Sequence, residues 1–407
     1  MAKGKDSKPH IGIFGRRNYG KSSLINALTG QQVAIVSEVP GTTTDPVKKS
    51  VEIFGIGPAI LIDTAGIDDE GSLGNLRIKK THEVIPLIDM AMLVITGGKV
   101  EEWEKKLMDI FRKQAIPFFL INNKADLFRV TEEELKNLKE HWGTDVVNFS
   151  AKTRQGLDEV IALMRKHTPE NTYRQTSMLA GLIKPGDVVV LVTPIDSEAP
   201  EGRLILPQVQ TIRDVLDNDG VAVVLKEDQT ARFLRDNPIK PALVISDSQV
   251  ILKTCKDVPE NIPTTGFSIL LAHYKGDFKN YLKGTPSLKN LKDGDKILIL
   301  ESCTHQVSCD DIGRVKIPRW ISQFTNKKLS FRVVAGTEKI PDDISQYAMV
   351  IQCGGCVLTK RQIINRLKPA VEAGVPVSNY GMTIAFVNGV YDRVIQPFIR
   401  KDEEKNE

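Results

Sequence analysis

The stretch Gly15-Arg16-Arg17-Asn18-Tyr19-Gly20-Lys21-Ser22 fits the phosphate-loop pattern G-x-x-x-x-G-K-[ST]. An apolar segment, 11–14, precedes it and Ser23-Leu24-Ile25-Asn26-Ala27-Leu28 follows, so the loop is expected to join a strand to a helix. Glycines let backbone N–H groups close around a phosphate, and the positive end of the new helix faces the same place. We therefore expect Lys21 to reach the β- and γ-phosphates of a nucleotide and Ser22 to bind Mg²⁺.

Apolar runs and amphipathic stretches alternate through the first part of the chain. Expected strands are 51–54, 59–62, 90–95, 117–121 and 146–149, with helices at 102–114 and 132–142. This βαβ alternation predicts an α/β fold whose N-terminal phosphate-loop domain is a doubly wound sheet. Breaks in the pattern near 169–172 and 258–263 predict two smaller α/β domains after it, which gives the boundaries 1–170, 171–263 and 264–407. Their expected strands include 188–192, 221–225 and 330–334.

Polar signatures follow the expected strands of the first domain, where ligands of such sheets bind. Asp63-Thr64-Ala65-Gly66 places Asp63 to hold Mg²⁺ and the Gly66 N–H to meet a γ-phosphate. Asn123-Lys124-Ala125-Asp126 offers a carboxylate to the N1–H and amino group of guanine, and adenine lacks both donors. Ser150-Ala151-Lys152 supplies backbone N–H groups for guanine O6. The flexible segment 40–45 contains Thr43 and is expected to act as a switch in a Mg²⁺-dependent GTPase.

The totals narrow the class of protein. With 407 residues, 41% of them apolar, and no apolar run near membrane-spanning length, a multidomain cytoplasmic protein is expected. Residues 1–10 are short and polar, so no signal peptide is predicted. The net charge of +4 is too small to predict nucleic-acid binding without a concentrated basic patch, and Lys275, Lys279 and Lys283 are interpreted as a solvated helix face.

All five cysteines lie after residue 250. Cys303-Thr304-His305 and Cys353-Gly354-Gly355-Cys356 each follow an expected strand, so parallel pairing would bring them to one edge of a sheet. Three thiolates and an imidazole fit either zinc or an iron–sulfur cluster, with a dithiol redox motif as a third interpretation. Cys255 and Cys309 are interpreted as structural, with Cys309 as a reserve ligand.

The first domain resembles the TrmE and Era group of GTPases, which carry an asparagine in the phosphate loop and a Gly-Thr-Thr switch. The resemblance implies that Asn18 helps to coordinate K⁺ and that Thr43 contacts Mg²⁺, so the predicted catalytic residues are Lys21, Asn18 and Thr43. Ile67 stands where Ras-like enzymes have a water-orienting glutamine, so intrinsic GTP hydrolysis should be slow and raised by a monovalent cation or a partner. Arg16 and Arg17 are interpreted as solvated loop residues.

Across its full length the chain resembles the HydF family of FeFe-hydrogenase maturation GTPases, with Cys303, His305, Cys353 and Cys356 matching the cluster motif. The resemblance implies a homodimeric scaffold that binds a 4Fe-4S cluster, receives a diiron precursor from radical maturation enzymes and delivers it to the hydrogenase apoprotein. Gln352 departs from the family, which often has histidine there. The fourth cluster ligand stays open between His305, water, a carboxylate and Cys309. The alternative is a GTPase of tRNA modification or ribosome assembly with a C-terminal metal-binding domain, and a plain spacer is the alternative to a dimerising middle domain.

Overall fold

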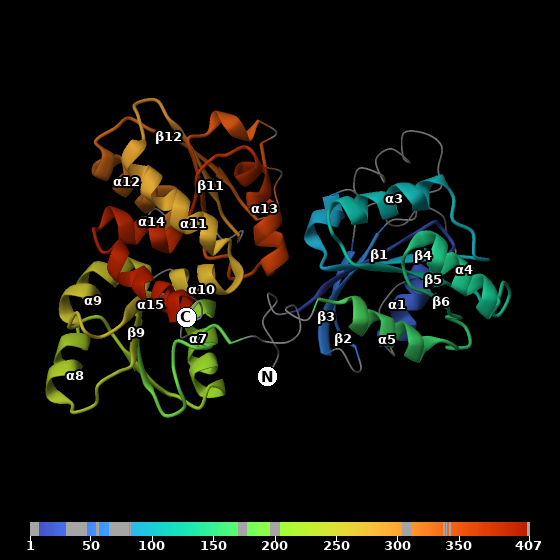
Figure 1. Cartoon of the computed structure of the whole chain (residues 1–407), viewed down its shortest axis with the longest axis horizontal. Helices are drawn as coiled ribbons and strands as arrows, with labels where there is room; N and C mark the ends of the chain where they lie inside the picture. The colour runs from blue at the N-terminus through green and yellow to red at the C-terminus, as the bar shows by residue number, and fades with distance from the viewer. Residues whose placement is uncertain are drawn as a thin grey trace. The chain divides into compact units, whose positions relative to one another are not determined.

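The computed structural model describes residues 8–29, 47–53, 57–64, 81, 83–169, 177–195, 204–302, 311–336, 338, 340–341 and 343–404. The chain divides into two compact units, Met1–Gln175 and Thr176–Glu407 (Figure 1). Each is described by itself. Some residues with predicted roles lie outside the described ranges: Thr43, Gly66, Ile67, Cys303, His305 and Cys309.

The first unit contains a six-stranded sheet with the order β2-β3-β1-β4-β5-β6. Its strands are β1 (His10–Gly15), β2 (Val47–Ile53), β3 (Gly57–Asp63), β4 (Met90–Ile95), β5 (Phe118–Asn122) and β6 (Val146–Asn148). Its helices include α1 (Lys21–Thr29), α3 (Glu102–Lys113), α4 (Glu132–Trp142) and α5 (Leu157–His167). All strand pairs are parallel except β2 with β3. The predicted α/β class with an N-terminal doubly wound sheet is confirmed.

Helices cover both faces of this sheet, so its central strands are mostly apolar. Every residue of β1, β4 and β5 is buried. On one face Ile11 and Ile13 pack with Leu24 of α1 and Met164 of α5. On the other face Phe14 packs in a cluster with α3. Burial on both sides explains why these strands read as continuous hydrophobic runs without alternation.

His10, at the start of β1, makes the stability of the first unit depend on pH. His10 is only 7% exposed. Burial, with a smaller contribution from the positive charge of Lys48, lowers the pKa of His10 to about 4. In the unfolded chain the His10 imidazole binds a proton as the pH falls through 6.5, whereas in the folded chain it binds one only near pH 4. His10 therefore does not reduce the free energy of unfolding above pH 6.5. As the pH falls from 6.5 to 4, we expect that free energy to decrease by about 3 kcal/mol.

Urea unfolding at several pH values will measure this loss. In a Trp320→Phe background Trp103 and Trp142 report on the first unit. The His10→Gln variant should show a shallower decline of unfolding free energy between pH 6.5 and pH 4. The exposed His141 gives a matched His→Gln control that should keep the wild-type slope. Equal slopes in all three proteins would contradict the assignment.

The second unit contains two four-stranded parallel sheets, with orders β10-β9-β7-β8 and β12-β11-β13-β14. The strands are β7 (Val188–Val192), β8 (Val221–Leu225), β9 (Leu243–Ser246), β10 (Thr264–Gly266), β11 (Lys296–Leu300), β12 (Ser330–Val334), β13 (Met349–Gln352) and β14 (Val377–Asn379). The helices are α7 (Leu206–Asp217), α8 (Thr230–Asp236), α9 (Ile251–Asp257), α10 (Phe267–Lys275), α11 (Phe278–Gly284), α12 (Ile317–Thr325), α13 (Lys360–Glu372), α14 (Tyr380–Val387) and α15 (Tyr391–Glu404). Further α/β sheets after the first domain are thus confirmed.

One apolar core of this unit includes side chains from both sheets and from α10, α14 and α15, and a separate small cluster contains Val190, Val192, Val244 and Val258. The last helix, α15, reaches back to the first of these sheets. Phe398 lies 4.7 Å from the ring of His273 and 5.2 Å from that of Phe278. The Arg393 guanidinium donates to the carbonyls of Cys255, Val258 and Pro259, at the end of α9 and just after it. Residues more than a hundred positions apart therefore close one core.

The structure differs from two sequence-based expectations here. Strand β10 pairs with β9, Thr264 opposite Val244, so the predicted boundary after residue 263 cuts a sheet. The chain also breaks its helix between α10 and α11, and Lys275 is only 5% exposed because its ammonium donates to the carbonyl of Leu358 at 3.1 Å. The solvated-face interpretation holds for Lys279 and is wrong for Lys275.

Within the described residues, no helix combines the length and the apolar character needed to cross a membrane.

Candidate functional site

The phosphate loop joins β1 to α1, as its sequence predicts. Asn18 is exposed with φ of 61°, and Gly20 has φ of 84°. A Cβ on Gly20 would lie 2.3 Å from Asn123 Nδ2, so only glycine fits. Lys21 is 8% exposed, and its ammonium donates to the carbonyls of Gly15 at 2.9 Å and Arg16 at 3.0 Å. These carbonyls hold the cation beside the N-terminus of α1, where a phosphate would bind.

Asp63, at the end of β3, faces the same loop. Ser22 Oγ donates to its Oδ2 at 3.4 Å, and within the described part of the chain its Oδ1 is buried without a hydrogen-bond partner. Burial raises the pKa of Asp63, and the nearby Lys21 charge opposes that rise. A buried carboxylate oxygen without a partner beside a serine hydroxyl fits a divalent cation with oxygen ligands. Ser22 and Asp63 are thus suited to hold Mg²⁺, directly or through water.

The base-reading loops follow β5 and β6. Asn123 is 1% exposed, and its Nδ2 donates to the carbonyl of Tyr19 at 2.8 Å while its Oδ1 accepts from Ala151 N at 3.2 Å. Asp126 is exposed, and its Oδ1 accepts from Ser150 Oγ at 2.7 Å. Asn123 therefore connects the phosphate loop to both base-reading loops. Its side chain is fixed by contacts that the sequence spacing does not show.

The predicted nucleotide residues that the structure describes all lie at the carboxyl edge of the sheet. They are Gly15, Asn18, Gly20, Lys21, Ser22, Ser23, Asp63, Asn123, Lys124, Asp126, Ser150, Ala151 and Lys152. Thr43 and Gly66 lie outside the described residues, so nothing is added to their predicted contacts.

Arg16 is held within the protein, and its interpretation as a solvated loop residue is wrong. Its guanidinium makes two hydrogen bonds, at 2.8 and 3.2 Å, to Glu104 and an ion pair at 2.8 Å with Glu101. Glu104 is 1% exposed, and the hydrogen bonds to it raise the pKa of Arg16. Arg16 therefore anchors the phosphate loop to the start of α3, a positioning role missed from sequence because its partner lies 88 residues away.

A second group of reactive side chains lies in the second unit, where β13 ends. The Cys353 N–H donates to the carbonyl of Leu300 at 2.9 Å, and Cys353 Sγ lies 2.8 Å from Ser302 Oγ. The turn to Cys356 passes through Gly355, with φ of 66°, where a Cβ would lie 2.4 Å from Ile363 Cδ1. Among the described residues neither thiol forms a disulfide, and both cysteines are half-buried.

Parallel pairing of β11 with β13, Leu300 opposite Gln352, brings the end of β11 beside the cysteine loop. Cys303 directly follows Ser302 in sequence but, like His305, is outside the described residues. In the part of the chain that is described, no group of three or more His, Cys, Asp or Glu side chains forms a metal site. Cys255 is buried in α9, and burial raises its thiol pKa, consistent with a structural residue.

Sequence comparison was made against models of known families. The Hydrogen maturase F dimerization domain matches residues 178–276, and the Hydrogen maturase F tetramerization domain matches residues 279–397. Together they span more than half of the chain. The chain belongs to the hydrogen maturase F family. A third match, to the 50S ribosome-binding GTPase domain over residues 10–124, identifies the first unit of this hydrogen maturase F chain as a GTPase domain.

Curated relatives match about two fifths of the chain. The tRNA modification GTPase MnmE of Hamiltonella defensa is 33% identical over 183 residues, 42% of this chain and 37% of the relative. That of Pasteurella multocida is 37% identical over 177 residues, with the same shares. The chain thus spans little more than a third of the length of these relatives. Their similarity supports membership of the TrmE-like group.

Solved structures align at low identity. A variant of Aquifex aeolicus Era bound to GDP.AlF4⁻ is 20% identical with a TM-score of 0.36, covering 54% of this chain and 92% of that chain. A probable GTP-binding protein engB is 22% identical with a TM-score of 0.33, covering 39% and 98%.

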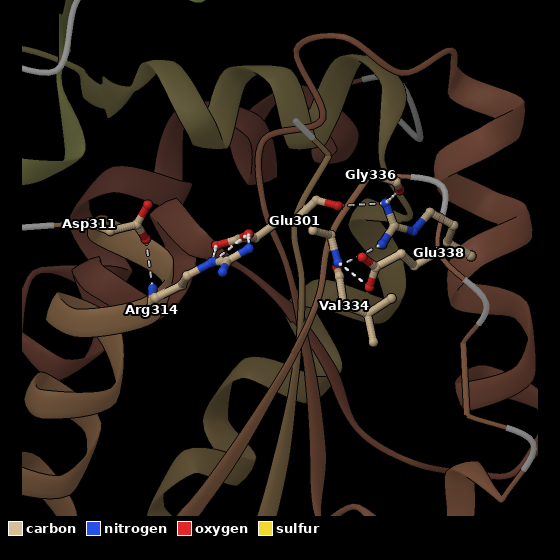
Figure 2. Close-up of polar contacts among 8 residues, drawn as sticks. Glu301, Asp311, Arg314, Val334, Gly336 and Glu338 are labelled. Carbon is tan, nitrogen blue, oxygen red and sulfur yellow. Dashed lines mark hydrogen bonds and ion pairs between the residues drawn. The ribbon is translucent and has the colours of Figure 1, made fainter. Parts of the chain in front are cut away.

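In this hydrogen maturase F chain, two arginines fasten the strand ends beside the cysteine loop (Figure 2). Glu301, directly after β11, is 4% exposed and accepts three hydrogen bonds of 2.9–3.3 Å from the Arg314 guanidinium. The Arg314 N–H in turn donates to Asp311 Oδ1 at 2.7 Å. Arg366 of α13 donates to the carbonyls of Glu301 and Gly336 at 2.7 and 2.6 Å. These bonds fix the backbone that leads from β11 toward the third predicted thiol.

Proposed function

We propose that this chain is a GTPase and iron–sulfur scaffold of FeFe-hydrogenase maturation. The first domain, 1–170, would hydrolyse GTP with Mg²⁺, a middle domain would dimerise, and the C-terminal domain would hold a 4Fe-4S cluster on Cys303, Cys353 and Cys356, with His305 beside it. The scaffold would take a diiron precursor from radical maturation enzymes and pass it to the hydrogenase apoprotein in the cytoplasm. Family membership and the GTPase domain support a role as a GTPase in hydrogenase maturation.

The observation that carries the cluster proposal is the junction of β11 and β13. Cys353 Sγ lies 2.8 Å from Ser302 Oγ, and the next residue in sequence is Cys303. The two half-buried cysteines lie at the ends of the Cys353-Gly354-Gly355-Cys356 turn, in which Gly355 has φ of 66° and packs against Ile363. Cysteine thiolates are the usual ligands of iron–sulfur clusters. A cluster with three thiolates supplies one coordination position for an exchangeable ligand.

The proposal is tested by measuring iron, acid-labile sulfide and zinc in protein purified without oxygen. Near four irons and four sulfides per chain are expected. Stoichiometric zinc without sulfide would favour the alternative GTPase with a metal-binding domain. Absence of both elements would remove the cluster from the function and leave the GTPase.

GTP hydrolysis should depend on K⁺ through Asn18. This residue is exposed in the left-handed region of the phosphate loop, so its amide oxygen is open to a cation. We expect hydrolysis roughly tenfold faster in KCl than in NaCl, a change of about 1.4 kcal/mol in the barrier. Asn18→Gly removes the amide without backbone strain, because glycine adopts positive φ readily. That variant should lose the difference between the salts. Equal wild-type rates in both salts would refute the potassium site.

The middle domain should pair with a second copy along β8. This strand is the edge of its sheet, with Val221 50% and Val224 42% exposed, and Leu216 of the neighbouring α7 is 56% exposed. Apolar edge strands are normally covered, and the match to a dimerization domain over 178–276 supports another copy of this chain as the occupant.

Val224→Lys should weaken that association roughly thirtyfold, about 2 kcal/mol, as for a central interface residue. Light scattering after gel filtration should show the mass of the assembly falling by half at low micromolar concentration. Leu127→Lys, at an exposed apolar residue of the first unit, is the matched control. An unchanged mass in Val224→Lys would place the interface elsewhere.

A further inference from the structure

Gln352 ends strand β13 directly before Cys353, and its residue is 0% exposed. Its Nε2 lies 3.1 Å from Ser302 Oγ, 3.2 Å from the carbonyl oxygen of Cys353 and 3.5 Å from Cys353 Sγ. We propose that Gln352 and Ser302 are positioning residues that donate hydrogen bonds to the sulfur of Cys353 and so raise the reduction potential of the cluster bound there. The inference rests on the cluster assignment of the proposed function.

The direction of the protons follows from the contacts. Gln352 Nε2 carries only donors, so at 3.1 Å the Ser302 oxygen accepts its hydrogen bond. The Ser302 hydroxyl hydrogen is then directed to Cys353 Sγ, 2.8 Å away. A sulfur bound to iron has no hydrogen of its own and can only accept. The chain of donors from Gln352 through Ser302 to the sulfur suits a metal-bound thiolate.

The other end of the amide supports the same conclusion. Gln352 Oε1 is buried without a hydrogen-bond partner among the residues that the structure describes, which costs stability. Turning the amide over would aim that oxygen at the sulfur and at Ser302, leaving the thiolate without its donor. An apolar side chain of the same length would fill the space without the unpaired oxygen. The amide is therefore unfavourable for packing alone and favourable for donating toward Cys353.

Hydrogen bonds to cluster sulfurs stabilise the reduced state more, because one-electron reduction adds negative charge to the cluster. Losing such donors should move the potential to more negative values. Judged by the resemblance to the family alone, Gln352 only replaces a histidine that could bind iron. In this chain the residue would act on the ligand beside it without touching iron.

The test compares the midpoint potential of the reconstituted cluster, titrated with dithionite and followed by electron paramagnetic resonance, in full-length variants. Gln352→Met keeps the side-chain length and removes the donor, and Ser302→Ala removes the relay. Both should give a more negative potential at wild-type iron content, and Ser302→Thr, which keeps the hydroxyl, should stay near wild type. Gln323→Met, at an exposed site of α12, is the control for the same substitution.

Two further readouts separate this role from packing. In the metal-free protein Gln352→Met should melt close to wild type, because the variant removes an unpaired buried oxygen together with the hydrogen bonds from Nε2 to Ser302 and the Cys353 carbonyl. Transfer of the wild-type holoprotein to D₂O should shift its Fe–S stretching bands, and Gln352→Met should reduce that shift. A wild-type protein with a cluster but the same potential as Gln352→Met would overturn this inference alone. A wild-type protein without iron and sulfide would overturn the proposed function and this inference with it.

Discussion

Replacing Lys21 with alanine is expected to lower the rate of GTP hydrolysis at least about a hundredfold, since one preorganised charged donor to a transferring phosphoryl group contributes on that scale. The structure already positions the ammonium. Lys21 is 8% exposed and tied to the carbonyls of Gly15 and Arg16 at the mouth of the loop. The Lys21 ammonium does not need to move when a phosphate binds. Removing it should therefore slow the chemical step of hydrolysis.

Phosphate release under single-turnover conditions, with GTP and enzyme both well above their dissociation constant, separates the chemical step from binding. Lys113→Ala, at an exposed end of α3, is the matched control and should retain the wild-type rate. The fold should survive the change, because the Lys21 ammonium bonds to carbonyls of the phosphate loop and alanine favours helix. Turnover within a factor of about three of wild type in Lys21→Ala would remove the active-site assignment.

Loss of Cys353 is expected to reduce cluster occupancy several-fold or more. Three thiolates are the proposed anchors, and a serine hydroxyl at neutral pH replaces a thiolate poorly as an iron ligand. Cys353 is held on the strand end because its N–H donates to the carbonyl of Leu300 at 2.9 Å, which fixes the backbone that presents its thiol. Cys356→Ser and Cys303→Ser should behave alike.

Visible absorbance of the cluster and sulfide content after anaerobic reconstitution measure occupancy. Cys255→Ser is the matched control, because that thiol is buried in α9 and should leave the cluster unchanged. Wild-type occupancy in Cys353→Ser would remove this residue from the ligand set. Loss of GTP hydrolysis in the same variant would instead indicate misfolding of the whole chain.

Much of the fold could be predicted because its strands are local, apolar and bounded by turn residues. The segments 90–95, 188–192, 221–225 and 330–334 agree in both bounds with the strands of the structure. The sequence did not show that the sheet continues past residue 263, because a three-residue strand such as β10 has too little periodicity to be recognised. Pairing with β9 is a tertiary contact, and only the folded chain reveals it.

The candidate site shows the same division. Motifs at strand ends fix which residues gather, since parallel strands bring their carboxyl ends together. What holds those residues was not predictable, because the partners are remote in sequence. Arg16 meets Glu104 across 88 residues, and Gln352 meets Ser302 across 50. Spacing within a motif contains no record of such pairs.

The return of α15 to the first sheet of the second unit has a consequence for synthesis on the ribosome. The GTPase domain can finish folding as soon as its last helix emerges, because its core uses residues before 170. The sheet of β7 to β10 cannot, since Val394 and Phe398 complete its shared core and Arg393 closes the carbonyls at the end of α9. Part of its apolar core must therefore wait for its partners until α15 has emerged. A stop codon at Arg393 would leave that sheet unfinished although none of its own strands had been lost.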